Sequence, residues 1–411
     1  MILVGFVIAI LLPMLVRQWT TGIPITQATQ YNTALGGVMA LLLGVLSYRR
    51  LHIFPGIVAG SYVFMALTTT FAVLAVSFFM MRIDYSRLQF LSSYLLSLAL
   101  YLYIHQKIAL HRRLRVGVVP SEATLRLPAF DNVDWILLEP QDAPDKIVVD
   151  AIVVDLRADH EDCWDTQITH YVLRAIPVYH FKQVIEQLSG RVEIKHLSEN
   201  TLGALNPNDV YLKLKGAADI LAATVLFLVL SPIMLVTAMM VKIDSPGPAI
   251  FRQQRIGYRG KLFTIYKMRT MRVDTPTVAT SDVQVLQNAM TQVDDPRITR
   301  LGQFLRRSRL DELPQLVNIM RGEMSLIGPR PEAVPLSRWY EKEIPFYHYR
   351  HLIKPGVTGW AQINQGHVTD VADVREKLHL DFYYVKNLSF WLDVLISVRT
   401  LRTMVSGHGA R

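Results

Sequence analysis

The chain has 411 residues, and this length predicts two or three folding units. Hydrophobic residues make up 51% of it and the net charge is +9, a balance that suits an anionic membrane surface or phosphate ligands as well as nucleic acid. The single cysteine, Cys163, excludes an internal disulfide framework and agrees with a reducing compartment; without CxxC or HExxH motifs, a structural zinc site is not expected.

Four apolar stretches in the first 106 residues predict a four-helix transmembrane anchor: residues 2–16, 34–48, 54–81 and 88–104. The first resembles a signal peptide, but no Lys or Arg precedes it and no small-residue cleavage site follows, so an anchoring helix is the better interpretation. Basic residues follow the second and fourth stretches, and the positive-inside rule then places both ends in the cytoplasm. Arg82 and Arg87, in the opposite loop, weaken this orientation.

Residues 107–210 alternate short β-branched runs with polar stretches, as in "RVGVV", "WILLE" and "KIVVDAIVVDL". A helix is predicted over 161–173, followed by strands in "IPVYHF" and "VEIKHL". This pattern favours a small Rossmann-like α/β domain with buried parallel strands. Gly117 stands alone before Pro120, so the glycine-rich turn of a dinucleotide site is missing and a regulatory or dimerising role is favoured.

The remaining residues, 211–411, begin with a fifth apolar run, 220–241, that carries Ser231-Pro232 at its middle and basic residues on both sides. Proline removes a backbone donor and kinks a helix. Each half would be about 17 Å long at about 1.5 Å per residue, close to one leaflet. We therefore predict a re-entrant membrane helix over 219–242 that enters and leaves on the cytoplasmic face. The alternative is a plain fifth span, which would place everything after residue 245 outside the cell.

Basic residues then alternate with apolar ones up to residue 272, and they include Lys267 and Arg269. Their spacing fits a solvated or lipid-facing surface and a phosphate pocket beside the membrane equally well. Further on, "RLGQFLRRSRLDELPQLVNIM" predicts a basic amphipathic helix lying in the headgroup region, which brings Asp311 and Glu312 to the interface.

Several cations and one carboxylate complete the candidate site. Two prolines in "IGPRPE" hold Arg330 in a stiff extended loop, where its planar guanidinium matches phosphate oxygens. The other candidates for phosphate or substrate binding are Arg306, Arg309, Arg350, Lys354 and Asp381. The last helical pattern, around residues 388–395, is most simply a core or membrane contact.

A carboxylate that attacks phosphorus is repelled by the phosphate oxygens. At about 4 Å two like charges repel by roughly 4 kcal/mol at an effective dielectric constant of 20. Arginines or a divalent metal must offset this repulsion. Asp311 and Glu312 beside Arg306, Arg309 and Arg330 therefore suit covalent phosphoryl transfer, although salt bridges on a helix surface explain the same pattern.

The order of six motifs resembles the bacterial sugar transferase family, the monotopic polyprenyl-phosphate phosphoglycosyl transferases. The motifs are "DSPGPAIFRQQRIG", "KLFTIYKMRTM", "DDPRITRLGQFLRRSRLDELPQL", "GEMSLIGPRPE", "KPGVTGWAQIN" and "LDFYYVKN". They span nearly half the chain, and the N-terminal spans and α/β segment resemble the larger members. One departure is "KGAADI" from Lys215, where family members often have Lys-Arg and an aromatic residue before the aspartate.

The resemblance implies transfer of a sugar 1-phosphate from a UDP-sugar to undecaprenyl phosphate at the cytoplasmic face of the bacterial inner membrane, as the first membrane step of capsule, O-antigen or exopolysaccharide synthesis. Asp311 matches the nucleophile, which would carry the phosphosugar while UMP leaves. Glu312 completes the dyad; our interpretation is that it helps Asp311 to bind Mg²⁺, with Mn²⁺ as the alternative ion, or that it tunes the nucleophile. Arg330 matches a phosphate-binding position, Asp381 a polar position near the site, and Ser231-Pro232 the re-entrant helix break.

Other functions stay open at this stage. A membrane-anchored regulator or sensor acting through the middle domain predicts that removal of residues 1–210 abolishes function, whereas an enzyme retains some transfer in 211–411. A transferase of the multi-span type needs spans after residue 245, and nucleic-acid binding lacks a recognised fold. Membrane lipids are expected partners and a homodimer is left open. Glucose, galactose and N-acetylated amino sugars all remain candidates, with an unmodified hexose favoured by analogy.

Overall fold

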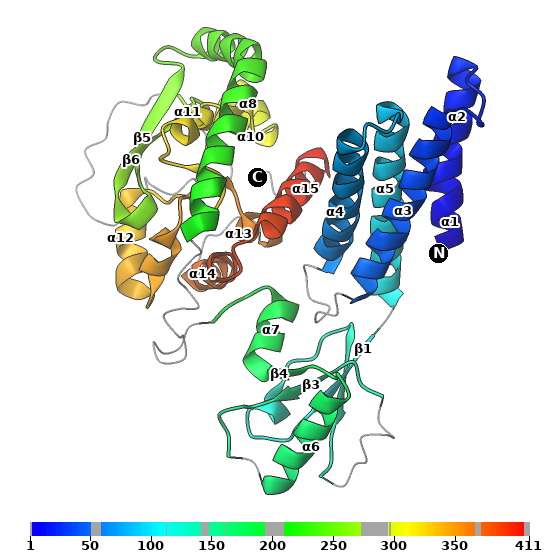
Figure 1. The fold of residues 1–411 in the computed structure, drawn as a ribbon. Helices are drawn as coiled ribbons and strands as arrows, with labels where there is room; N and C mark the ends of the chain where they lie inside the picture. The colour runs from blue at the N-terminus through cyan, green and yellow to red at the C-terminus, as the bar shows by residue number, and fades with distance from the viewer. Residues whose placement is uncertain are drawn as a thin grey trace. The chain divides into compact units, whose positions relative to one another are not determined.

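The computed structural model describes residues 2–50, 59–111, 113–140, 148–159, 161–193, 209–272, 295, 297–365 and 371–406. The chain divides into two compact units, Met1–Ser189 and Gly190–Arg411. Figure 1 shows helices grouped in the N-terminal half of the first unit and a mixed helix and strand arrangement in the second.

The first unit begins with four apolar helical segments. The first segment is continuous but contains a π-helical stretch, and the bounds are α1 Ile2–Phe6, η1 Val7–Leu11, α2 Leu12–Thr21, α3 Ala28–Arg50, α4 Ala59–Met80 and α5 Arg87–His111. Three windows here are long and apolar enough to cross a bilayer, Val4–Thr21, Ala28–Tyr48 and Val63–Met80. The predicted anchor is therefore present as four apolar helices, and the start of its third stretch, residues 54–58, lies outside the described residues.

Glycines allow the helices of this bundle to approach closely. A Cβ atom at Gly36 would lie 2.2 Å from the ring of Phe78, and one at Gly44 would lie 2.8 Å from the side chain of Leu67. Small residues at such crossings let membrane helices gain van der Waals contact where lipid offers no hydrophobic driving force between them. Packing of α3 against α4 thus depends on the glycines of α3.

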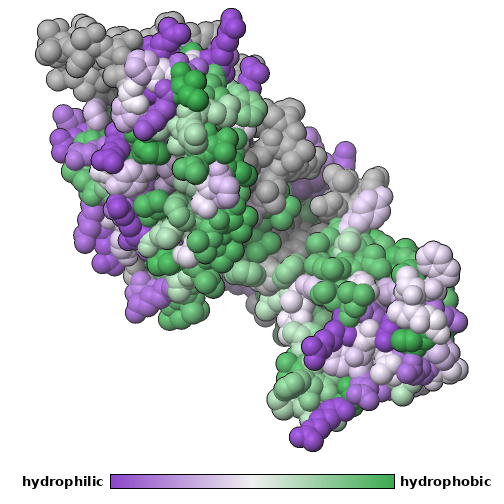
Figure 2. All heavy atoms as spheres, turned by 90° about the horizontal axis from the view of Figure 1, so that it is seen from above, coloured by the Kyte–Doolittle hydropathy of each residue, from purple (hydrophilic) through white to green (hydrophobic). Residues whose placement is uncertain are grey.

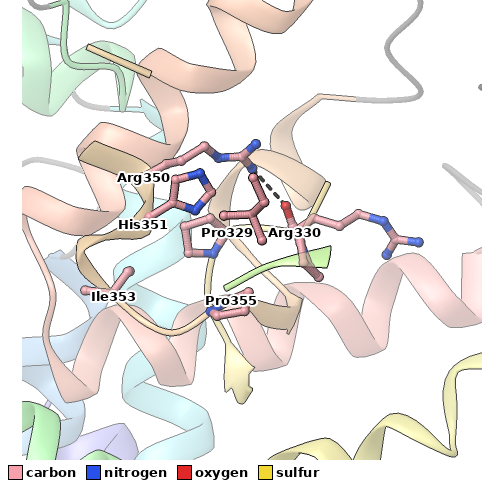
Figure 3. Close-up of a pocket in the computed structure, with 8 residues that line it drawn as sticks. Pro329, Arg330, Arg350, His351, Ile353 and Pro355 are labelled. Atoms are coloured by element: carbon pink, nitrogen blue, oxygen red, sulfur yellow. Dashed lines mark hydrogen bonds between the residues drawn. The ribbon is translucent and has the colours of Figure 1, made fainter. Parts of the chain in front are cut away.

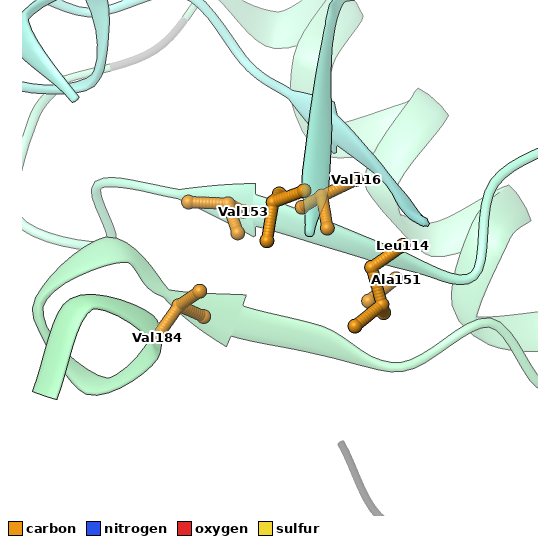
Figure 4. Packing of buried hydrophobic residues seen from close by; sticks show 6 residues of the cluster. Leu114, Val116, Ala151, Val153 and Val184 are labelled. Atoms are coloured by element: carbon orange, nitrogen blue, oxygen red, sulfur yellow. The ribbon is translucent and has the colours of Figure 1, made fainter. Parts of the chain in front are cut away.

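The rest of the first unit is a four-stranded parallel sheet in the order β2-β1-β3-β4. Its elements are β1 Leu114–Val118, η2 Thr124–Arg126, β2 Val133–Leu137, β3 Ala151–Val154, α6 Asp162–Leu173, β4 Val178–His180 and α7 Phe181–Ser189. Figure 4 shows Val116 of β1, Val153 of β3 and Val184 of α7, which belong to one small apolar core. The strands predicted around residues 115, 135, 151 and 178 and the helix at 161–173 are confirmed, while most of the strand predicted in "VEIKHL" lies outside the described residues.

The second unit contains one long helix, two small sheets and several short helices. The bounds are α8 Asp209–Asp244, β5 Ile250–Ile256, η3 Tyr258–Gly260, β6 Leu262–Met268, α10 Arg300–Arg307, η4 Leu310–Glu312, α11 Gln315–Met320, β7 Ser325–Ile327, α12 Val334–Glu343, η5 Tyr347–Leu352, β8 Gly356–Thr358, α13 Trp360–Asn364, α14 Val371–Lys386 and α15 Phe390–Ser406. Strands β5 and β6 form an antiparallel hairpin, and β7 pairs with β8 in parallel.

The long helix α8 continues through Pro232, so the proline at the predicted break does not end the helix. Its axis nevertheless turns sharply in Figure 1. Ala223 in its first part packs with Phe263 and Ile265 of β6, and Val241 near its end packs with Met268 of the same strand. Both parts of α8 therefore contact the same small domain, as a bent helix can, and re-entry into a membrane stays a prediction.

Much of α8 is covered with exposed apolar side chains. The helix is long and apolar enough to cross a bilayer, and only 11% of the residues in its most apolar stretch are buried inside the protein. Leu221, Leu228 and Leu235, each seven residues apart, are more than 60% exposed. Figure 2 shows a band of hydrophobic residues flanked by hydrophilic ones on the part of the molecule that contains α8. An exposed apolar band of this extent marks a membrane or protein contact.

Candidate active site

The carboxylate pair lies in a turn between two helices. α10 ends at Arg307, Arg309 adopts a left-handed backbone with φ of 58°, and Asp311 and Glu312 follow in the 3-10 turn η4. Pro314 then precedes α11. The predicted basic amphipathic helix is present as α10, but it ends before the carboxylates, because the left-handed residue turns the chain and the proline starts a new helix. Both carboxylates are buried, at 8% and 6% exposure.

Glu312 is the anion around which three cations gather. Its Oε1 atom lies 2.6 Å from Nη2 of Arg330, 3.3 Å from Nζ of Lys267 and 3.6 Å from Nη1 of Arg309. Burial alone raises the pKa of Glu312, but Arg330, Lys267 and Arg309 outweigh it and hold this pKa far below the usual range of a glutamate. Glu312 is therefore a fixed negative charge and a poor proton acceptor.

Asp311 has the opposite electrostatic character. Burial raises its pKa, the neighbouring Glu312 carboxylate raises it further, and Lys267, Arg330 and Arg306 act in the other direction. Desolvation favours nucleophilic attack by this carboxylate, and the neighbouring cations can receive the phosphate that it would attack. Burial, together with the charge of Arg330, lowers the pKa of Lys267 to about 8.

Arg330 is presented by a loop that we call the arginine loop, residues 327–332. Arg350 donates from Nη2 to the Arg330 carbonyl at 2.9 Å, and Arg255 donates from Nη1 to the Pro331 carbonyl at 3.1 Å. Figure 3 shows the Arg330 side chain leaving this backbone contact and pointing away from Arg350. Arg350 and Arg255 thus hold the backbone of the loop on one side, and the Arg330 guanidinium contacts Glu312 on the other side.

Close backbone contacts seat the arginine loop on the segment that contains β8. A Cβ atom at Gly328 would lie 2.4 Å from the carbonyl oxygen of Lys354, and one at Gly359 would lie 2.2 Å from the carbonyl oxygen of Gly328. Only glycine leaves room for this approach. The glycines of "KPGVTGW" and "IGPRP" are therefore needed for the backbone packing under the site.

Two of the predicted binding residues, Arg350 and Asp381, are buried and paired with each other. They are 3% and 2% exposed, and they form an ion pair with 2.9 Å between Nη2 and Oδ2. Arg350 also donates to the hydroxyl of Tyr347 at 2.6 Å. The two charges therefore face inward, and Arg350 supports the backbone of the arginine loop.

Arg269, another predicted binding residue, lies at the C-terminal end of α8. Its guanidinium donates to the carbonyls of Val241, Ser245 and Pro246, which lie at and just beyond the C-terminal end of α8. A cation at a helix C-terminus satisfies carbonyls that have no partner within the helix. Arg269 therefore fastens the end of α8 and has no donor pair directed at the carboxylates.

The remaining predicted cations differ in position. Arg306 donates from Nε to the Thr270 hydroxyl at 2.9 Å and still contributes positive charge at Asp311. Lys354 lies instead near two glycines, since its Nζ would be 3.8 Å from a Cβ at Gly216 and 3.6 Å from one at Gly322. The structure thus brings together Lys267, Arg306, Arg309, Arg330 and both carboxylates, and places Arg269, Arg350, Lys354 and Asp381 in other surroundings.

Sequence reasoning missed three residues that hold the site. Arg255 holds Pro331, and Glu332 pairs with Lys377 at 2.6 Å. Burial raises the pKa of Glu332. The positive charges of Lys377, Arg350 and Arg255 outweigh this effect and lower the pKa to about 2. Glu332 lies in the quoted "IGPRPE" motif, which was the available signal; Lys377 lies in a helical stretch where nothing distinguishes it from a solvated lysine.

A divalent metal fits the carboxylates only together with a ligand. Within the part of the chain that the structure describes, no group of three or more His, Cys, Asp or Glu side chains is suited to hold an ion. Mg²⁺ commonly takes one or two carboxylates and completes its shell with substrate phosphate and water. The three cation contacts of Glu312 fall on Oε1, so Asp311 and the other Glu312 oxygen are the donors that suit such an ion.

A buried carboxylate pair surrounded by cations, beside a helix with an exposed apolar band, defines a membrane-associated transferase site. The family model described as Bacterial sugar transferase matches residues 210–407. Over 410 residues the chain is 40% identical to the UDP-N-acetylgalactosamine-undecaprenyl-phosphate N-acetylgalactosaminephosphotransferase of Aeromonas hydrophila, covering 99% of this chain and 94% of that protein. The chain belongs to the bacterial sugar transferase family.

Other relatives match about half of the chain. The UDP-glucose:undecaprenyl-phosphate glucose-1-phosphate transferase of Escherichia coli (strain K12) is 40% identical over 220 residues, which are 53% of this chain and 44% of that protein. The exopolysaccharide production protein PSS of Rhizobium leguminosarum bv. phaseoli is 42% identical over 195 residues, 46% of this chain and 94% of that protein. The expected family is thus confirmed, and the chain is a transferase with membrane helices.

Proposed function

We propose that this chain transfers a sugar 1-phosphate from a UDP-sugar to undecaprenyl phosphate and releases UMP. The substrates in the names of the relatives support this proposal. The observation that carries it is the Asp311–Glu312 pair, buried in the family domain and surrounded by Lys267, Arg309 and Arg330. We place the reaction at the cytoplasmic face of the bacterial inner membrane, with α8 re-entering the bilayer from that side.

In the first step an oxygen of ionised Asp311 attacks the β-phosphorus of the UDP-sugar. The bond from that phosphorus to the bridging oxygen breaks, and the electron pair leaves with UMP. Asp311 then carries the sugar phosphate as an acyl phosphate. Arg330 and Lys267 neutralise phosphate charge as it approaches the carboxylate, which offsets the repulsion between two anions.

In the second step a phosphate oxygen of undecaprenyl phosphate attacks the same phosphorus. The bond to Asp311 breaks, the carboxylate is regenerated, and the product is a lipid diphosphate sugar. Splitting the transfer in this way lets one set of cations serve both substrates in turn. Glu312 holds those cations in place through both steps because it stays ionised.

Asp311 and Glu312 would hold the divalent ion, which supplies charge neutralisation to the phosphates when bound. Mg²⁺ is the expected ion and Mn²⁺ the alternative.

The test is UMP release from purified full-length protein in nanodiscs that contain undecaprenyl phosphate. UDP-N-acetylgalactosamine, UDP-glucose and UDP-galactose form the panel, since the relatives are named for different sugars. Transfer with one of them, and loss of transfer in Asp311→Asn, supports the proposal. A parent protein that releases no UMP with any sugar in the panel contradicts it and would favour the regulator or sensor function.

A further inference from the structure

One face of α14 follows the arginine loop along its length. Lys377, Asp381 and Tyr384 are spaced four and three residues apart, so they lie on the same side of the helix. Each makes or supports a contact to a different part of the loop. Lys377 contacts the end of the loop, Asp381 acts on its middle through Arg350, and Tyr384 lies at its start. The helix and the loop therefore run in opposite directions.

The middle contact passes through Arg350. The Asp381 carboxylate pairs with the Arg350 guanidinium, and the same Nη2 atom of Arg350 donates to the Arg330 carbonyl at 2.9 Å. The side chain of Arg330 is 31% exposed, whereas those of Arg350 and Asp381 are 3% and 2% exposed. A substrate can therefore reach Arg330 and cannot reach the pair behind it.

The outer contacts fix the ends of the loop. Nζ of Lys377 lies 2.6 Å from Oε1 of Glu332, and the Tyr384 hydroxyl oxygen lies 3.2 Å from the Ile327 carbonyl oxygen. Tyr384 is itself held by Asp393, 2.5 Å from its hydroxyl. With both ends fixed, the direction of the Arg330 side chain depends on the backbone between them, where Arg350 acts.

We propose that Asp381, acting through Arg350, is a positioning residue that sets the Arg330 guanidinium against Glu312 and the transferring phosphate. This inference rests on the proposed function, because it assumes that Arg330 serves the phosphate. Asp381 touches no reacting atom. It keeps the Arg350 guanidinium oriented so that its donor meets the Arg330 carbonyl.

A buried ion pair suits this task because the attraction of the Asp381 carboxylate holds the Arg350 guanidinium in place, and that guanidinium makes a directional hydrogen bond to the Arg330 carbonyl. Replacing such a pair with apolar residues of similar volume is often neutral for stability, so its stability contribution does not explain its presence. A misplacement of about 1 Å at a binding group can slow a reaction by about a hundredfold. Loss of the Asp381 charge is therefore expected to act on the rate far more than on substrate affinity.

The test is a double-mutant cycle on full-length protein in nanodiscs, with Asp381→Asn, Arg330→Ala and the two combined. We expect Asp381→Asn to lower kcat by about ten- to a hundredfold in the parent, with KM for the UDP-sugar changed by less than about threefold. In the Arg330→Ala background the same change should cost less than about threefold. Asp381→Glu should recover part of the rate.

Asp295→Asn is the matched control. This carboxylate is 6% exposed and pairs with Arg297 at 2.6 Å. Asp295→Asn should change kcat by the same factor in the parent and in the Arg330→Ala background. If Asp381→Asn also costs the same factor in both backgrounds, the positioning role is wrong and the residue is structural.

A second variant guards against misfolding, since Asp381→Asn leaves Arg350 charged and buried. Arg350→Met combined with Asp381→Leu removes both charges, and we expect a thermal unfolding midpoint near that of the parent with the rate loss of Asp381→Asn. A folded double variant with parental kcat overturns the inference. Parental activity in Arg330→Ala instead contradicts the role of Arg330, and absence of transfer in the parent contradicts the proposed function, so the three failures are distinguishable.

Discussion

The parallel sheet of the first unit and the arginine loop of the second are stabilised in different ways. The sheet is held by aliphatic side chains such as Val116, Ile152 and Val153, all with essentially no exposed surface. The loop is held by the ion pairs Arg350–Asp381 and Lys377–Glu332. Burial of apolar area is non-directional and tolerates substitution of similar volume, whereas charged hydrogen bonds fix the direction of a group. In the second unit, buried ion pairs thus fix the direction of catalytic groups. Substitutions in the sheet should therefore change stability, and substitutions at the arginine loop should change the reaction rate.

The largest effect is expected at the nucleophile. Asp311→Asn keeps the shape of the side chain but removes the attacking oxygen anion, so UMP release should fall by about a thousandfold or more. Intact-protein mass spectrometry during turnover without lipid acceptor should show the sugar-phosphate mass on the parent only. Asp295→Asn, which removes a buried carboxylate that pairs with Arg297, is the control. Equal turnover by Asp311→Asn and the parent would falsify the covalent mechanism.

Removal of divalent metal is expected to come next. Chelation by EDTA should lower UMP release by about a hundredfold or more, because charge neutralisation at phosphate contributes several kcal/mol to such reactions. Added Mg²⁺ or Mn²⁺ should restore the rate. Full activity in EDTA would show that Lys267, Arg309 and Arg330 suffice.

Glu312→Gln tests the fixed anion. The cations at 2.6 to 3.6 Å from its Oε1 would lose their common partner, repel one another and shift. We expect kcat to fall by about a hundredfold at pH 6 and by more at pH 9, because Glu312 raises the pKa of Lys267 and its loss leaves more of this lysine neutral. Parental kcat in Glu312→Gln would show that the cations serve the site without this anion.

The smallest effect on catalysis is expected in the sheet. Ile152→Ala leaves a cavity in a fully buried position and should destabilise the α/β domain by about 2–5 kcal/mol, measured by hydrogen exchange of the β1 and β3 amides. Leu137→Ala, at a residue that is 55% exposed, is the control and should change stability by less than about 0.5 kcal/mol. We expect kcat within about twofold of the parent for both; a large loss with Ile152→Ala would show that the sheet acts on the site.

The amino-acid sequence by itself determined the apolar helices, the parallel strands and the identity of the carboxylate pair, because hydrophobic periodicity and motif order are local properties of the chain. It did not determine which arginines face the carboxylates. Arg269, Arg330 and Arg350 carry the same charge, yet one fastens the end of α8, one reaches Glu312 and one holds a carbonyl behind it. Only the tertiary structure decided these roles, since each depends on groups brought together from distant parts of the chain, and a long flexible side chain gives no sign in the sequence of the partner that will bury it.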